Sequence, residues 1–127
     1  MLRSAGAVAV GYLVFGASGA MLFQLSGQNA HAAAPTSFKI ASIVWGAVFA
    51  LVAGWLAARV AGRKPATHAA IVAALIALGA IVSLAMSSGD AKWSQISAAT
   101  IMAPCAWIGG LISRRDKSTN PKSTSPN

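Results

Sequence analysis

The sequence predicts an all-α integral membrane protein, a bundle of four transmembrane helices joined by short loops. Hydrophobic residues make up 56% of its 127 residues and charged residues only 9%, against about 25% charged in an ordinary soluble domain. The charged residues leave four long uncharged stretches, at residues 4–38, 40–58, 65–89 and 93–113. A bilayer core about 30 Å thick takes about 20 apolar helical residues to cross, so each stretch can hold one span.

The first span is expected at about residues 5–23, in a segment rich in glycine and alanine. A loop with several Gln, Asn and Ser residues and with Pro35 follows it. A second interpretation of residues 1–32 stays open, because a basic start, an apolar run and Ala-His-Ala at 30–32 also fit a cleaved secretory signal. Cleavage there would leave three spans. The apolar run is longer than the about 7 to 15 residues typical of such signals, which favours a retained helix.

The second span is expected at about residues 40–58, and a basic turn follows it in which Gly62 and Pro65 stop the helix. The third span is expected at about residues 68–86. Thr67 directly precedes this apolar run, and its hydroxyl is of the type that caps helix N-termini.

The fourth span is expected at about residues 93–112 and completes a single transmembrane domain over residues 1–113. Pro104 cannot donate a hydrogen bond to the carbonyl of Thr100, so we expect a kink in this helix. Residues 114–127 are polar and repetitive and have little apolar surface to bury, which predicts a disordered tail.

The distribution of basic residues predicts the orientation. With the N-terminus inside, only Lys39 and Lys92 lie on the outer side. The inner side holds Arg3, Arg59, Arg63, Lys64, Arg114, Arg115, Lys117 and Lys122. Lys and Arg accumulate on the side that is not translocated, so we expect both termini in the cytoplasm. The small size and alanine-rich helices favour a bacterial inner membrane. Five of the inner residues form a cytoplasmic basic collar: Arg59, Arg63, Lys64, Arg114 and Arg115.

Acidic residues are too few for several kinds of chemistry. The chain has no Glu, and its only acids, Asp90 and Asp116, lie outside the apolar stretches. Proton-coupled carriers usually need an ionisable group within the membrane, and acid–base hydrolysis needs paired catalytic groups. The single cysteine, Cys105, has no second thiol for a disulfide or a metal site. We therefore expect no enzyme activity and no cofactor. The net charge of +8 is explained by topology, so we expect no nucleic-acid partner.

Small residues recur every four positions along several spans, a spacing that lets two helix backbones approach closely in a membrane. These rows are Gly46, Ala50 and Gly54 in the second span, Gly16 and Ala20 in the first, and Ala106 and Gly110 in the fourth. We expect them to pack the bundle internally and to leave one row for a second copy or a larger membrane partner.

Polar side chains gather toward the outer ends of the third and fourth spans. They include Ser83, Ser87, Ser97 and Thr100. Such hydroxyls either line a shallow cavity or bond to carbonyls of their own helices.

The preferred function is therefore a non-enzymatic packing or interaction protein, for example an accessory subunit. The alternative is a passive channel for a small neutral or weakly polar solute.

Overall fold

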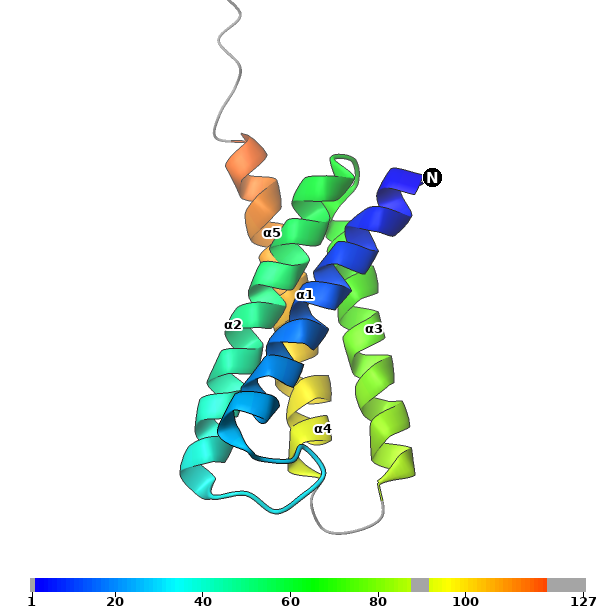
Figure 1. Cartoon of the computed structure of the whole chain (residues 1–127). Helices are drawn as coiled ribbons and strands as arrows, with labels where there is room; N and C mark the ends of the chain where they lie inside the picture. The colour runs from blue at the N-terminus through cyan, green and yellow to red at the C-terminus, as the bar shows by residue number, and fades with distance from the viewer. Residues whose placement is uncertain (1, 88–91, 119–127) are drawn as a thin grey trace, which may run out of the picture.

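The computed structural model describes residues 2–87 and 92–118, with the side chains of residues 3–87 and 92–115. Its helices in chain order are α1 (Leu2–Ser26), α2 (Thr36–Ala61), α3 (Pro65–Met86), α4 (Trp93–Ser97), the π-helical η1 (Ala98–Met102) and α5 (Ala103–Ser118). Helices α4, η1 and α5 follow one another without a break as one span (Figure 1). Within the described residues four spans are long and apolar enough to cross a membrane, which confirms the predicted four-helix membrane bundle.

The helices alternate in direction, so the bundle has two different ends (Figure 1). We call one the termini end, because it holds the start of α1, the α2–α3 turn and the end of α5. We call the other the loop end, because it holds the long α1–α2 loop, residues 27–35, together with the end of α3 and the start of α4. This loop is shorter than expected, because α2 already begins at Thr36.

The turn between α2 and α3 contains two residues in left-handed backbone conformations. Gly62 ends α2 with a φ of 71°, and Lys64 precedes α3 with a φ of 47°. Helix α3 begins at Pro65, so the expectation that Thr67 caps this helix is wrong. Proline suits the first helical position, because the amide that it lacks would have no partner there.

The fourth span widens into a π-turn immediately before the proline that predicted a kink. The amide of Ala103 donates to the carbonyl of Ala98, five residues earlier, and Pro104 follows. A proline ring collides with the carbonyl four residues before it, and a π-turn is one way in which a helix accommodates such a local disruption. Helix α5 continues through residues 114–118, so the predicted tail starts too early; residues 119–127 lie outside the described part.

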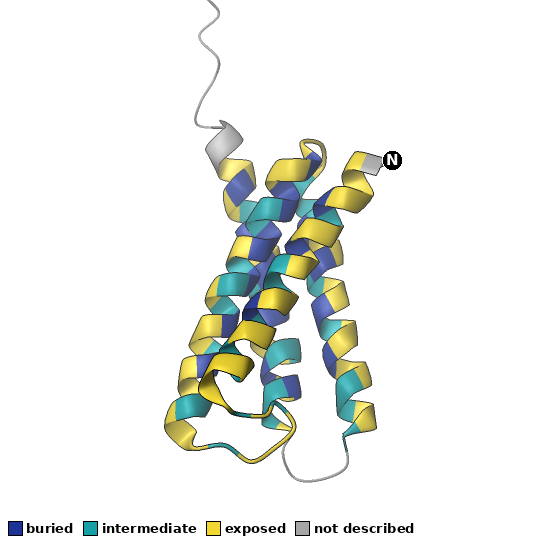
Figure 2. Cartoon of the chain, in the orientation of Figure 1, coloured by how far each residue is buried: buried dark blue, intermediate teal, exposed yellow. Residues whose placement is uncertain are grey.

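The core is built mainly of alanine and lies around α2, which packs against α1, α3 and α5. Its buried members are Ala50, Ala53, Ala57, Val72, Ile76, Met102, Ala103 and Ala106. Buried residues face the middle of the bundle, and exposed ones cover its outer faces (Figure 2). Many of the exposed residues are large and apolar, such as Leu13, Leu78 and Ile81. Hydrocarbon is the solvent that suits such a surface.

Candidate functional site

Toward the termini end, α2 and α5 contact each other backbone to backbone. A Cβ built on Gly54 would collide with the Ala106 carbonyl, 2.6 Å from its carbon atom. A Cβ on Gly109 would lie 2.9 Å from the carbonyl carbon of Leu51, so the close approach is reciprocal. Gly110 lies against the side-chain methyl group of Ala69 on α3 and likewise leaves no room for a Cβ. Glycine at these positions therefore lets α2, α3 and α5 close this half of the bundle.

The row on α2 is used entirely inside the bundle. Gly46 faces the side chain of Met102, whose Sδ would lie 2.7 Å from an added Cβ, and Ala50 is fully buried. On α1 the situation is the opposite, because nothing lies within 4 Å of a Cβ added to Gly16, and Ala20 is exposed. Among the predicted rows, the one on α1 has no internal neighbour within the described residues.

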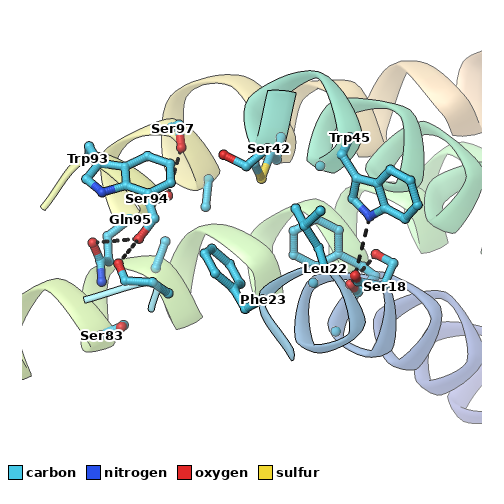
Figure 3. Close-up of a pocket in the computed structure, with 18 of the residues that line it drawn as sticks. Ser18, Leu22, Phe23, Ser42, Trp45, Ser83, Trp93, Ser94, Gln95 and Ser97 are labelled. Carbon is cyan, nitrogen blue, oxygen red and sulfur yellow. Dashed lines mark hydrogen bonds between the residues drawn. The ribbon is translucent and has the colours of Figure 1, made fainter. Parts of the chain in front are cut away.

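Toward the loop end the bundle is hollow. A crevice of about 260 Å³ lies between α1 on one side and α4 and η1 on the other, with α2 and α3 contributing to its walls (Figure 3). Its polar and aromatic lining includes Ser18, Phe23, Ser42, Trp45, Ser83, Trp93, Ser94, Gln95 and Ser97. The deeper lining includes Phe15, Gly16, Gly46, Ala98 and Met102.

Three of the serines that line the crevice donate hydrogen bonds within their own helices. The hydroxyls of Ser18, Ser42 and Ser97 donate to carbonyls three residues earlier in their own helices, at 2.7, 2.9 and 2.9 Å. These three hydroxyl protons are therefore already used, although each oxygen can still accept a hydrogen bond.

The structure brings only part of the predicted polar set together. Ser83 and Ser97 line the crevice, whereas Ser87 lines a neighbouring hollow that shares Ser83 with it. Thr100 is exposed, does not line the crevice and donates to the carbonyl of Ile96 at 2.7 Å.

The α1–α2 loop forms a roof over the crevice. Ser94 Oγ donates to the Ala30 carbonyl at 2.6 Å, and Trp93 Nε1 donates to the Ala32 carbonyl at 3.2 Å. Between these bonds, Nε2 of the buried Gln95 lies 2.8 Å from Nδ1 of His31. The sequence placed these groups at the same end of the bundle but gave no sign that they bond to one another.

Aromatic rings from different helices contact one another at the loop end. Phe38 makes edge contacts with Phe23 and Trp93, at centroid distances of 5.8 and 6.3 Å. The ammonium group of Lys39 lies 5.9 Å from the centroid of Trp93, and Trp45 Nε1 donates to the Ser18 carbonyl at 3.3 Å. The crevice is therefore bounded by connected side chains of three helices.

The basic collar lies at the opposite, termini end. Its members are Arg59, Arg63, Lys64, Arg114 and Arg115. The Arg59 guanidinium lies 4.9 Å from the Trp55 ring centroid. Arg3, from the start of α1, donates through Nε to the Val60 carbonyl at 3.0 Å. A hollow beside the collar is lined by Lys64, residues 65–67 and Arg114.

No protein-family model, curated protein or solved structure matches the chain. The described residues bring no group of three His, Cys, Asp or Glu side chains together. The function is therefore argued from the crevice, the helix faces and the composition alone.

Proposed function

We propose that the chain is a non-enzymatic interaction protein of a bacterial inner membrane, an accessory subunit that associates through the lipid-facing side of α1. The termini end, which carries the basic collar, faces the cytoplasm in this proposal, because basic residues stay on the side that is not translocated. The observation that carries it is the difference between two similar rows. The α2 row is buried inside the bundle, whereas Gly16 and Ala20 on α1 have no internal partner.

Helix α1 is also the least buried of the four spans. In a membrane, association depends on close packing and hydrogen bonds rather than on hydrophobic burial, so a face of small residues is suited to a partner helix. A second copy and a different membrane protein are both compatible with this face.

A passive conduit is the second candidate, and the polar-rimmed crevice is the observation that favours it. The crevice lies toward the loop end, however, and the contacts of Gly54, Gly109 and Gly110 close the bundle beyond it. A solute would need a path that separates these backbones, which supports the interaction role over the conduit.

Ala20→Leu tests the proposed interface, because Ala20 is exposed and does not line the crevice. In native membranes, chemical crosslinking and co-purification should detect an associated copy or partner for the wild type and lose it for Ala20→Leu. Ala74→Leu, at an exposed alanine of α3, is the matched control and should keep the association.

Flux measurements in proteoliposomes address the conduit. We expect glycerol permeability no higher than in protein-free vesicles. Permeability that rises with the protein and falls in Ser83→Ala would refute the interaction role, and so would a chain that is monomeric and without partners in native membranes.

A further inference from the structure

The crevice is bordered by α1 and α3 as well as by α4 and η1. Within the described residues, α1 packs against α2 and α3 but not against α4, η1 or α5. Toward the loop end α1 and α3 diverge, and α4 lies behind the space between them (Figure 1). Gly16 and Gly19 of α1 border the crevice, and nothing lies within 4 Å of a Cβ added at either position. A route between α1 and α3 would let a molecule dissolved in the bilayer enter without passing through the roof.

The polarity of the lining changes with depth. Phe15 and Met102 lie at the deep end, near the middle of the bundle, whereas Ser94, Gln95 and His31 lie at the loop end. Ser18, Ser42 and Ser97, which lie between them, already donate to their own helices. The lining thus suits a molecule with an apolar tail that points toward the membrane centre and a polar group at the membrane surface.

The volume suits an alkyl chain. A cavity of about 150 Å³ holds benzene, so the crevice, at about 260 Å³, has room for about ten carbons at the same volume per carbon. An acyl chain of a membrane lipid supplies such a segment and is present beside α1 and α3 in any bilayer.

A hydrogen-bonding ring and a cationic side chain lie at the loop end of the crevice. The Nδ1 atom of His31 lies 2.8 Å from Gln95 Nε2 and 3.2 Å from Ser87 Oγ, whereas Nε2 of this ring has no hydrogen-bond partner among the described residues. In the tautomer that carries its proton on Nε2, the ring can donate a hydrogen bond to a bound molecule. Lys39 lies against Trp93, a ring that lines the crevice. An ester carbonyl and a phosphate are the complementary acceptor and anion.

We propose that the crevice binds one phospholipid from the leaflet at the loop end. One acyl chain lies between α1 and η1, His31 donates to a glycerol-ester carbonyl, and the phosphate lies near Lys39. Gly16 borders this lipid site as well as belonging to the small-residue row of α1, but Ala20 lies outside the crevice, and the lipid site does not depend on association through Ala20.

Native mass spectrometry of the chain in mild detergent, titrated with palmitoyl-oleoyl phosphatidylglycerol, tests the site. The wild type should bind one phospholipid in preference to further ones. Gly19→Phe places a ring in the crevice and should weaken binding at least about tenfold. Gly6→Phe is the matched control, because Gly6 also has open space around it but does not line the crevice, and its binding should be unchanged.

The polar end is tested with His31→Phe, which keeps an aromatic ring and removes the donor. Loss of one hydrogen bond should weaken phospholipid binding about two- to tenfold. The matched control is His68→Phe at the termini end, which should bind like the wild type. Thermal unfolding followed by circular dichroism verifies that each variant is folded.

Equal phospholipid binding by folded Gly19→Phe and Gly6→Phe would overturn the proposal. It would also be overturned if the purified chain bound no phospholipid selectively, as expected if the crevice instead held a helix of a protein partner. Neither result would bear on association through Ala20, so failure of this proposal is distinguishable from failure of the proposed function.

Discussion

Replacing Gly54 by alanine adds one methyl group where α2 and α5 touch, and we expect it to force the two helices apart. The new Cβ would collide with the Ala106 carbonyl, 2.6 Å from its carbon atom and 3.1 Å from Cα. Carbon atoms pack best about 3.5–4.0 Å apart, so one backbone has to move by about 1 Å. No rotamer change can relieve this contact, because the obstructing atoms belong to the main chain.

The expected cost follows from two opposing effects. Overpacking of a tight core costs about 1–3 kcal/mol, and occasionally more. Alanine recovers up to about 1 kcal/mol of helix propensity over glycine. Because the same movement disturbs the reciprocal contact of Gly109 with Leu51, we place the cost at the upper end. The net expectation for Gly54→Ala is a loss of about 2 kcal/mol in the free energy of unfolding.

Gly16→Ala is the matched control, because it makes the same chemical change on a helix where nothing lies within 4 Å of the added Cβ. It should leave stability unchanged or raise it by up to about 1 kcal/mol. Reversible unfolding in mixed micelles of a mild detergent and dodecyl sulfate, followed by circular dichroism, measures both variants. Equal stabilities would refute direct backbone contact between α2 and α5.

Three further predictions test local features. Ser113→Ala should raise the free energy of unfolding by about 1 kcal/mol, because Ser113 Oγ is buried with no hydrogen-bond partner among the described residues. A lower free energy of unfolding in the same assay would show that this hydroxyl does have a hydrogen-bond partner. Lys64→Gly should stabilise by about 1 kcal/mol through relief of the left-handed backbone, whereas Lys64→Ala, with the same loss of charge, should bring no such gain. Gln95→Leu removes the hydrogen bond between Gln95 and His31 and should speed amide hydrogen exchange at His31 about two- to tenfold by loosening the α1–α2 loop. An unchanged exchange rate would count against this hydrogen bond. Thr100→Val is the control for Gln95→Leu and should leave this exchange unaffected.

The sequence predicts the spans well because a bilayer requires about 20 apolar helical residues, and the charges mark where each run ends. It predicts the helix ends less well. The second span is predicted to start just after Lys39, but α2 begins at Thr36, since a lysine in the first turn does not stop a helix. Thr67 has a capping side chain, but Pro65 and a left-handed Lys64 start the helix earlier. Few sequences place lysine in that conformation, so no composition rule reveals it.

Spacing shows which residues allow close approach, but it cannot show what approaches them. Gly46, Ala50 and Gly54 on α2 recur at the same four-residue spacing as Gly16 and Ala20 on α1. Only the tertiary arrangement places Gly46 and Gly54 against η1 and α5 and leaves the α1 pair without an internal neighbour. A leucine at Gly54 would therefore test the fold, whereas a leucine at Ala20 tests association.

The roof could not be predicted, because it depends on pairs far apart in the chain. His31 and Gln95 are separated by 64 positions, and each alone is typical of a residue at a membrane surface. Their bond becomes visible only when the α1–α2 loop is placed over the start of α4. Trp93 similarly resembles a surface anchor, yet its indole donates to the carbonyl of Ala32 in the same loop.

The two halves of the bundle constrain function in different ways. The half near the termini end is closed by backbone contacts at Gly54 and Gly109 and by the contact of Gly110 with the Ala69 methyl group, and separating them would disrupt the packing of these helices. A conduit through one chain would have to open this half in every transport event. Occupation of the crevice by a lipid, or of the α1 face by a partner helix, leaves these contacts intact. Lipid binding and partner binding are therefore both compatible with a half that stays closed, and this compatibility supports the proposed binding roles over the conduit.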